Sequence, residues 1–451
     1  MGKLFGTDGI RGVANQHPMT AEMALAVGRA TAYVLKREHK GFNRIVIGKD
    51  TRLSGYMLEN ALTAGICSMG VDVLLTGPIP TPGIAHLTRS MRCVAGIVIS
   101  ASHNPYEDNG IKVFASTGFK LSDALEAEIE ELVDSGMADD IRPTAHEIGR
   151  AKRIDDAQGR YVEFCKNTFP EDMTLEGVRL VLDCANGATY RVAPTIFREL
   201  GAEVFTIHDE PNGLNINDKC GSQHTQDLQR KVRELGAHAG LAFDGDGDRL
   251  IAVDENGVEL TGDHILAICA NHLKATGALR RNLMIITPMS NLGLRLALDK
   301  LGIQWQDAGV GDRLVLEMML RDGAIIGGEQ SGHVIFRDKH TTGDGIVTAL
   351  QLLAVMRAGG ASLSRLAEIF TPAPQVLINI EVKEKPPVET LPGVAGSIAA
   401  AEKELGQKGR VFVRYSGTQK MCRVMVEAES AEATQRLADA IAGEVRKAIG
   451  A

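Results

Sequence analysis

The sequence has no closely spaced cysteine pair, no long apolar run and no excess of basic residues. Its seven cysteines include no Cys-x-x-Cys pair, so neither a zinc ribbon nor a disulfide framework is indicated. No apolar run approaches the length of a membrane span, and no signal-peptide core follows the first residues. The net charge of -8 gives no reason to expect nucleic-acid binding. We therefore expect a cytoplasmic globular protein with neither a membrane nor a nucleic acid as partner.

The alternation of strand and helix patterns predicts several domains. At 451 residues the chain is too long for one ordinary core. Short apolar strands alternate with amphipathic helices in three rounds, which predicts mainly parallel sheets with helices on both faces. After Pro372 and Pro374 the pattern changes to short strands and one closing helix. We expect three doubly wound mixed α/β domains and a smaller C-terminal α+β domain around a central cleft, spanning residues 1–150, 151–255, 256–370 and 371–451.

The most informative segment is an acidic loop at residues 244–249, Asp-Gly-Asp-Gly-Asp-Arg. Asp244, Asp246 and Asp248 alternate with glycine, which lets the backbone turn tightly enough for the carboxylates to converge. Mg²⁺ prefers carboxylate oxygens, and the apolar run before the loop places it at a strand end. The alternatives are an EF-hand, which needs flanking helices and has Glu255 in register, and a solvated acidic turn.

A second polar segment, residues 100–112, follows an apolar strand and reads Ser-Ala-Ser-His-Asn-Pro-Tyr-Glu-Asp-Asn-Gly-Ile-Lys. A serine at such a turn can present its hydroxyl to an open cleft, but it needs a base or strong electrostatic help to act as a nucleophile. His103 and Lys112 are local candidates for proton transfer. The local residues alone leave open a serine that caps a helix.

Two further loops predict sugar and phosphate contacts. Glu329 and Ser331 stand two residues apart, so in an extended chain they face the hydroxyls or amine of a sugar together, unless the segment is a polar turn closed by glycine. Residues 414–423 carry three cations, two hydroxyls and backbone N–H groups around a glycine, which is typical of a phosphate site. The alternative for that segment is a surface hairpin with scattered charge.

Taken together, these segments resemble the α-D-phosphohexomutase superfamily along the whole chain. The resemblance is carried, in chain order, by residues 5–12, 48–52, 100–105, 244–249, 328–333 and 414–423. Asn215-Ile-Asn with Cys220-Gly-Ser, Met289-Ser-Asn-Leu-Gly and Gly309-Val-Gly-Asp-Arg are similar to the branch that acts on glucosamine phosphates rather than to the phosphomannomutase branch.

The resemblance implies a role for each loop. Ser102 would be a phosphoserine, required for activity, with Ser100 as the alternative hydroxyl. The ligands of one Mg²⁺ would be the Ser102 phosphate, Asp244, Asp246 and Asp248. Lys112 and His333 would transfer protons. Arg11 and Arg249 would stabilise the transferring charge, and Asp8 and His103 would line the same region. The sugar would be held by Glu329 and Ser331, and its other phosphate by Arg414, Ser416, Gly417, Thr418 and Arg423.

The implied reaction is an isomerisation that moves phosphate between O6 and O1 of glucosamine, through a bisphosphate, and feeds UDP-N-acetylglucosamine and peptidoglycan precursor synthesis. The alternatives are a phosphomannomutase or phosphoglucomutase of the same fold, and a silent phosphosugar binder or a phosphatase. The resemblance also suggests a homodimer. Tyr415, Gln419 and Lys420 depart from the family's usual loop, which has prolines and a glutamate there, and this affects its rigidity and contacts with substrate.

Overall fold

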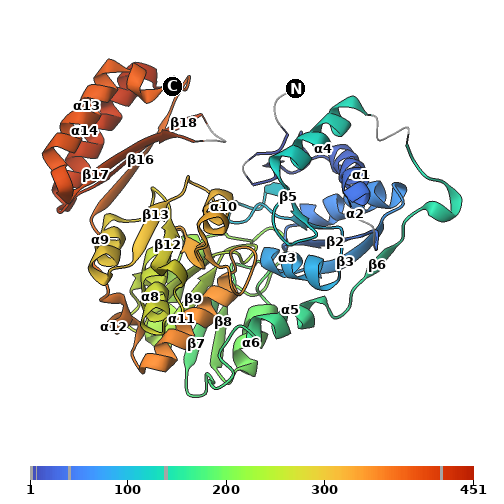
Figure 1. Ribbon diagram of the computed structural model, residues 1–451, viewed down its shortest axis with the longest axis horizontal. Coiled ribbons are helices and arrows are strands. Elements are labelled where there is room, and N and C mark those ends of the chain that lie inside the picture. The colour runs from blue at the N-terminus through green and yellow to red at the C-terminus, as the bar shows by residue number, and fades with distance from the viewer. Residues whose placement is uncertain (1–3, 7, 39–41, 137–140, 417–419) are drawn as a thin grey trace.

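The computed structural model describes residues 4–6, 8–38, 42–136, 141–416 and 420–451, and these residues form four sheets in four successive units (Figure 1). The first three units are α/β and the last is a small α+β unit, so the predicted fold class is confirmed. Of the described helices, none has the length and apolar content needed to cross a membrane. All seven cysteines are free thiols.

The first unit has a six-stranded sheet in the order β1-β5-β4-β2-β3-β6. Strands β2, β3, β4 and β6 run parallel, while β5 is antiparallel to both β4 and β1. The strands are β1 (Ile10–Val13), β2 (Arg44–Lys49), β3 (Asp72–Pro78), β4 (Ala95–Ile99), β5 (Asp108–Ala115) and β6 (Ala151–Arg153). The helices are α1 (Ala21–Glu38), α2 (Ser54–Ser68), α3 (Thr81–Ser90) and α4 (Asp123–Ser135).

The second unit has a five-stranded sheet in the order β11-β10-β9-β7-β8. Strands β7, β8 and β9 are parallel, and a hairpin joins β9 to the antiparallel β10. The strands are β7 (Arg179–Asp183), β8 (Glu203–Ile207), β9 (Ala239–Phe243), β10 (Leu250–Asp254) and β11 (Glu259–Leu260). The helices are α5 (Ala157–Lys166), α6 (Val192–Glu199) and α7 (Gln226–Leu235).

The third unit has a four-stranded sheet in the order β13-β12-β14-β15. Strands β13, β12 and β14 are parallel, and β15 returns antiparallel beside β14. The strands are β12 (Leu283–Ile286), β13 (Gln304–Asp307), β14 (Ile326–Gly328) and β15 (Val334–Phe336). The helices are α8 (Gly262–Ala275), α9 (Leu292–Leu301), α10 (Asp312–Asp322), α11 (Gly345–Gly359) and α12 (Leu363–Ala367).

Two of the expected domain limits fall within sheets rather than between them. Strand β6 pairs with β3, so the first sheet continues past residue 150 to Arg153. Strand β11 pairs with β10, so the second sheet continues past residue 255 to Leu260. Both strands are short. Strand β6 pairs with a strand far away along the chain, whereas β11 follows β10 directly and pairs with it in a short hairpin.

One apolar cluster crosses the first three units. It runs from Ile84 of α3 through Tyr161 of α5 and Phe243 of β9 to Ile286 of β12 and Leu350 of α11. Each of these side chains is fully buried. Burial of apolar surface contributes roughly 25 cal/mol per Å², so a shared cluster of this extent holds the three units against one another.

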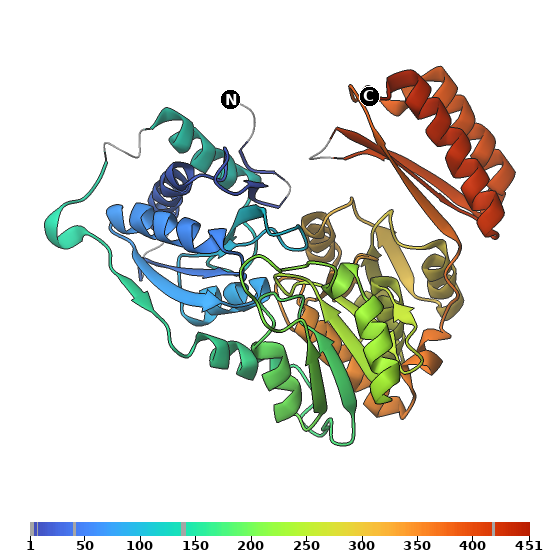
Figure 2. The same cartoon turned by 180° about the vertical axis from the view of Figure 1, so that it is seen from behind.

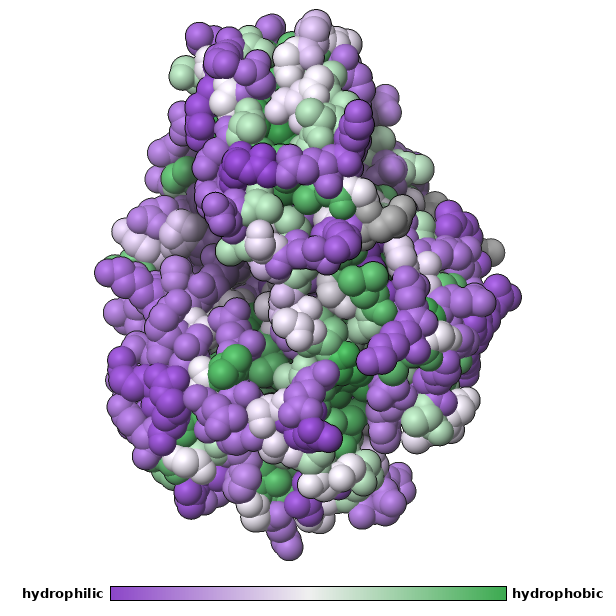
Figure 3. Space-filling view, turned by 90° about the vertical axis from the view of Figure 1, so that its left-hand side faces the viewer, coloured by the Kyte–Doolittle hydropathy of each residue, from purple (hydrophilic) through white to green (hydrophobic). Residues whose placement is uncertain are grey.

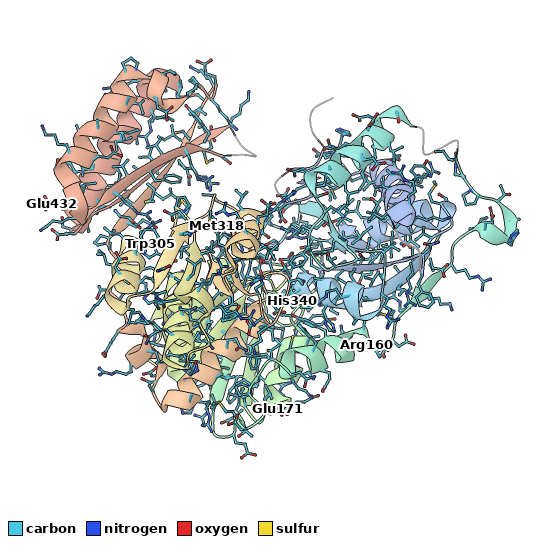
Figure 4. All side chains as sticks on the ribbon, in the orientation of Figure 1. Arg160, Glu171, Trp305, Met318, His340 and Glu432 are labelled. Carbon is cyan, nitrogen blue, oxygen red and sulfur yellow. The ribbon has the colours of Figure 1, made fainter. Side chains whose placement is uncertain are left out.

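Polar contacts also join the first and third units. His340, labelled in Figure 4, lies where these units meet, and its Nε2 is 3.0 Å from the carbonyl oxygen of Pro82. Its Nδ1 accepts the N–H of Thr341, so the proton is on Nε2 and the ring donates to Pro82. Burial lowers the pKa of His340 to about 3, which keeps the ring neutral.

The C-terminal unit has its own core. Its three-stranded antiparallel sheet has the order β16-β18-β17, with β16 (Gln375–Glu381), β17 (Arg410–Tyr415) and β18 (Met421–Glu427). Helices α13 (Pro392–Leu405) and α14 (Ala431–Ile449) cover one face and close a separate apolar cluster. Both ribbon views place this unit beside the third unit and away from the first (Figures 1 and 2). In Figure 3 its outer face, at the top, is mostly hydrophilic.

Candidate active site

The loop after β4 holds Ser102 in a buried and strained conformation. Its φ of 52° lies in the left-handed region, which costs about 1–3 kcal/mol, so its surroundings must fix it. The fully buried guanidinium of Arg52 donates hydrogen bonds to the carbonyl oxygens of Ser102 (2.9 Å) and Asn104 (2.8 Å). Its Nε donates to Asp50 at 2.8 Å. The shape of this loop therefore depends on an ion pair that lies outside it.

The two serines of this loop have different surroundings. Ser100 is fully buried, and its hydroxyl donates to Asp50 (2.6 Å) and accepts the Ser102 N–H (2.9 Å). The Ser102 hydroxyl donates to Asp244 Oδ2 at 2.6 Å and lies 3.2 Å from His103 Nδ1. Ser100 therefore shapes the loop, while Ser102 faces the acidic loop. The segment continues into β5, so neither serine caps a helix.

The acidic loop joins β9 to β10, where Phe243 pairs with Leu250. Strands rather than helices flank the loop, which excludes the EF-hand alternative. The three aspartates each offer a carboxylate oxygen, and these oxygens lie within 4.8 Å of one another: Asp244, Asp246 and Asp248. A Cβ on Gly245 would lie 2.7 Å from the Ser102 carbonyl oxygen, so glycine is what allows the two loops to touch.

This acidic loop lacks enough positive charge to balance it. Burial, followed by repulsion from Asp248 and Asp246, raises the pKa of Asp244 well above its usual value, and burial with Asp246 raises that of Asp248. Within the described part of the chain, no hydrogen bond reaches the buried Oδ1 atoms of Asp246 and Asp248. Such oxygens are costly to bury unless a cation contacts them. The donor type, convergence and charge therefore fit one Mg²⁺.

Lys112 and Thr81 contact the opposite side of the acidic loop, and Arg11 reaches the same region through Asp8. Lys112 Nζ lies 3.0 Å from Asp246 Oδ2 and 3.1 Å from Asp8 Oδ2. Burial alone would lower the pKa of Lys112, but Asp246 and Asp8 raise it above its usual value, so the ammonium stays charged. Arg11 lies 2.9 Å from the same Asp8 oxygen. Thr81 donates to Asp246 Oδ2 at 2.7 Å.

His103 and Arg249 lie on the Ser102 side of the acidic loop. Burial, together with Arg249 and Arg11, lowers the pKa of His103 to about 3, so its imidazole is neutral beside the Ser102 hydroxyl. The backbone N–H of Arg249 donates to Asp244 Oδ1 at 3.1 Å, and the side-chain Nε of Arg249 lies 4.0 Å from Asp248 Oδ1. His103 therefore lies beside Ser102, and Arg249 lies beside Asp244 and Asp248.

The turn between β14 and β15 supplies the third unit's side of the site. Glu329 Oε1 accepts the N–H of Gly311 at 3.1 Å, and the exposed Ser331 hydroxyl lies 3.4 Å from Glu329 Oε2. His333 is buried, and neither ring nitrogen has a hydrogen-bond partner among the described residues. A Cβ on Gly343 would lie 2.3 Å from His333 Nε2, so glycine there makes room for the ring.

A cavity of about 630 Å³ connects the groups from the first three units. Its lining includes Arg11, Ser102, Arg249, Glu329 and His333. A hexose phosphate is smaller than this volume, and small-molecule sites commonly have about 300–1,000 Å³. The lining therefore includes Ser102, Asp248 and Glu329, one residue from each of the predicted transfer, acidic and sugar-facing segments. It does not include these other predicted residues: Lys112, Asp244, Asp246 and Ser331.

The predicted phosphate loop is described only in part, and Glu329 of the cavity acts electrostatically on its Arg414. Arg414 on β17 pairs in register with Arg423 on β18, and burial with Arg423 lowers the pKa of Arg414. Ser416 is buried, and its carbonyl oxygen accepts from Lys385 Nζ at 2.7 Å. Gly417, Thr418 and Gln419 lie outside the described residues. No described residue of the C-terminal unit is among those that line the cavity.

Sequence reasoning assigned no role to Arg52 or Thr81. Arg52 belongs to a conspicuous Lys-Asp-Thr-Arg segment, but its partners are backbone carbonyls some 50 residues away. Thr81 begins α3 and reaches Asp246 across the boundary between the first and second units. Only the folded chain brings either residue to the site.

Comparison with known families follows the division into four units. Residues 2–140, 159–257, 261–373 and 377–444 match the descriptions of domains I, II and III and of the C-terminal domain of phosphoglucomutase/phosphomannomutase. The chain belongs to the phosphoglucomutase/phosphomannomutase family, which is the class of phosphohexomutases that its fold and site define.

Individual proteins of this family are similar to the chain over its full length. The chain is 59% identical over 451 residues to phosphoglucosamine mutase of Syntrophus aciditrophicus, covering 100% of both chains. It is 60% identical over 450 residues to phosphoglucosamine mutase of Syntrophobacter fumaroxidans, also covering 100% of both. A crystal structure of a phosphoglucomutase/phosphomannomutase family protein from Burkholderia thailandensis is 25% identical with a TM-score of 0.81, covering 99% of this chain and 97% of that chain.

A more distant structure shares the fold. It is an N-acetylphosphoglucosamine mutase from Aspergillus fumigatus, solved with GlcNAc-6P and magnesium. It is 18% identical with a TM-score of 0.68, and the match covers 99% of this chain and 96% of that chain.

Proposed function

We propose that this protein is a phosphoglucosamine mutase, an isomerase that interconverts glucosamine 6-phosphate and glucosamine 1-phosphate through a phosphoserine enzyme and a bisphosphate. The observation that carries the proposal is the 2.6 Å contact between Ser102 Oγ and Asp244 in a buried, cation-deficient acidic loop. The full-length similarity to enzymes named phosphoglucosamine mutase supports the choice of sugar. The product would feed UDP-N-acetylglucosamine synthesis.

In the proposed reaction the phosphoryl group moves from phosphorylated Ser102 to a sugar hydroxyl. The bond from phosphorus to Ser102 Oγ breaks and a bond to the sugar oxygen forms. We assign His333 to accept the proton of the sugar hydroxyl, because neither of its ring nitrogens makes a hydrogen bond to a described residue. We assign Lys112, held charged by Asp8 and Asp246, to return a proton to the oxygen that leaves.

The charge that develops on the transferring group is met by fixed positive groups. We assign this role to Arg11, held by Asp8, and to Arg249 beside Asp244. When bound by the three aspartates and the phosphoserine, Mg²⁺ would supply the electrostatic stabilisation that phosphoryl transfer chiefly needs. The neutral His103 ring would orient the Ser102 oxygen.

The sugar and its second phosphate would be held by the third and fourth units. We assign the sugar hydroxyls and amine to Glu329 and Ser331. We assign the phosphate that is not transferred to Arg414, Ser416, Gly417, Thr418 and Arg423. The two cations that pair across β17 and β18, Arg414 and Arg423, support an anion site there. A single site for the phosphate that is not transferred has to serve both orientations of the sugar, and we propose that the C-terminal unit opens and recloses between the two transfers.

Three properties of the whole molecule remain part of the proposal. We propose that the chain has four domains, near residues 1–150, 151–255, 256–370 and 371–451, and that each contributes one loop to the active site. Seven free thiols support a reducing, cytoplasmic location. A homodimer rests on resemblance alone, and light scattering of the purified protein would test it.

Turnover and intact mass test the function together. Phosphorylated, Mg²⁺-loaded protein should convert glucosamine 6-phosphate to glucosamine 1-phosphate faster than it isomerises mannose or glucose phosphates. Intact mass should show one phosphate that phosphatase treatment removes. Preference for mannose or glucose phosphate would instead identify the phosphomannomutase or phosphoglucomutase alternative. Net release of inorganic phosphate would indicate a phosphatase, and binding without turnover a silent binder.

A further inference from the structure

A ladder of alternating charges extends from the acidic loop toward the sugar side of the cavity. Its first part runs from Asp246 through Lys112 to Asp8, at 3.0 and 3.1 Å. It continues from Asp8 Oδ1 to Lys120 Nζ at 2.5 Å and from Lys120 Nζ to Asp312 Oδ2 at 2.6 Å. The last two residues have no role in the reaction as described so far.

Lys120 and Asp312 come from different units. Lys120 lies between β5 and α4 of the first unit, and Asp312 is the first residue of α10 in the third. Asp312 Oδ2 also lies 3.7 Å from Nε2 of His333. The preceding Gly311 donates its N–H to Glu329. The Lys120–Asp312 pair therefore connects Asp8, which contacts Lys112, to the turn that carries Glu329 and His333.

The pair is shielded and is not the main contact that joins the two units. The Lys120 and Asp312 side chains are only 16% and 20% exposed, which makes their attraction stronger than that of a surface pair. The first and third units are also joined by the apolar cluster, by His340 with Pro82 and by Arg313 with Glu126. Loss of the Lys120 charge should therefore leave the units packed while changing their alignment at the cavity.

We infer that Lys120 and Asp312 are positioning residues, whose ion pair aligns the sugar-facing turn of Glu329 and His333 with Lys112 and Asp8 at the transfer site. This inference rests on the proposed mutase function. A misplacement of about 1 Å can reduce the rate about 100-fold when it changes the alignment of reacting groups. Because alignment matters most in the transition state, the effect falls on kcat rather than on KM.

The test compares variants of the phosphorylated, Mg²⁺-loaded full chain with glucosamine 6-phosphate as substrate. Lys120→Met, which removes the charge and keeps the length, should lower kcat about 30- to 100-fold and change KM less than about threefold. Asp312→Asn, which keeps the side-chain shape, should give the same result even if Lys120→Met reduces the yield of folded protein. Lys120→Arg should keep kcat within about fivefold of the unmodified chain.

A double variant and a matched control separate alignment from general stability. Lys120→Met combined with Asp312→Asn should be no slower than the slower single variant, because both changes remove one interaction. Lys166→Met is the control, since Lys166 makes a pair of similar length, 2.7 Å, with Glu199, but within the second unit and away from the cavity. It should leave kcat within about twofold.

Two results would overturn the inference alone. One is a kcat for Lys120→Met within threefold of the unmodified chain, when that chain turns over. The other is a deficit confined to KM or to the melting temperature, which is what a purely structural contact would give. An unmodified chain that does not isomerise glucosamine phosphates would instead refute the proposed function, and the inference with it.

Discussion

Two clusters of metal-ligating side chains are found among the described residues, and both lie in the second unit. The first is the acidic loop, and the second consists of Asp183, His208 and Cys220. Asp183 accepts the N–H groups of Ala185 and Gly221, both at 2.9 Å, and lies 3.1 Å from His208 Nδ1. Burial raises the pKa of Cys220 to about 12, so it remains a neutral thiol.

The difference between the clusters is one of charge. In the second cluster the Asp183 carboxylate, 3.1 Å from His208 Nδ1, raises the pKa of His208 and so favours the imidazolium form that balances this carboxylate. In the acidic loop three carboxylates repel one another and two buried oxygens have no described partner. Ligand types alone therefore do not identify a metal site. A charge deficit that the protein itself does not balance is the more informative sign.

The largest expected contrast is between Ser102, which lies beside the acidic loop, and Cys220, which belongs to the second cluster. Ser102→Ala should lower kcat about 10⁴-fold or more and abolish transfer of labelled phosphate from protein to sugar, because no phosphoserine can form. Cys220→Ser should change kcat less than about threefold. Steady-state kinetics and label transfer measure both, and a Ser102→Ala protein with full activity would remove Ser102 from the mechanism.

Carboxylate replacements should act in opposite directions on stability. Asp248→Asn should raise the free energy of unfolding of the metal-free protein, because it removes a repelled charge, and should lower turnover at least about 100-fold. Asp183→Asn should lower the free energy of unfolding by about 2 kcal/mol, because it leaves a buried N–H group unpaired. Denaturant titration in EDTA gives both values, and a stability change of the same sign in both variants would contradict the comparison.

The response to Mg²⁺ should depend on pH. The pKa values of Asp244 and Asp248 are raised in the folded state, so the folded protein keeps protons that the unfolded chain has lost. Stability of the metal-free protein therefore falls as pH rises from the unfolded value of about 4 through the folded pKa values. Mg²⁺ needs the ionised form, so it should raise the melting temperature more at pH 7.5 than at pH 5. Equal shifts at the two pH values would argue against the acidic loop as the metal site.

The smallest effect concerns His208. Its pKa is raised in the folded protein, so the contribution of its ion pair with Asp183 is fully present below the unfolded value of about 6.5. That contribution disappears as pH rises through the folded pKa. His208→Asn should lower the free energy of unfolding by under about 1 kcal/mol at pH 6, because His208 is partly exposed. The loss should be smaller at pH 9, where the ring is less often protonated. Denaturant titration at both pH values would measure this, and a larger loss at pH 9 would reverse the assigned sign.

Local signals made much of the fold predictable. Helix α4 has a local signal at each end, because Ser122 accepts the Leu125 N–H at its start and Gly136 has a φ of 67° at its end. The acidic loop was equally clear, since alternation with glycine is a local property. The change to short strands and a closing helix after Pro374 is also seen in the structure, as β16, β17, β18 and α14.

Contacts between distant segments were not predictable from the sequence in this way. The residues gave no reason to prefer Ser102 over Ser100, which only the burial and partners of each hydroxyl distinguish. The clamp by Arg52 and the Lys120–Asp312 pair join segments 50 and 192 residues apart. Strand β6 pairs with β3, which lies far away along the chain, and β11 pairs with β10 through a short hairpin. Both strands therefore extend their sheets beyond the expected domain limits at residues 150 and 255.

The apolar cluster shared by the first three units also affects how the molecule comes apart. Since each of those units buries side chains of the others, they should melt as one cooperative block. The C-terminal unit, with a core of its own, can open without exposing that block. Differential scanning calorimetry should then resolve two endotherms, and limited proteolysis should cut between α12 and β16 before it attacks the remainder.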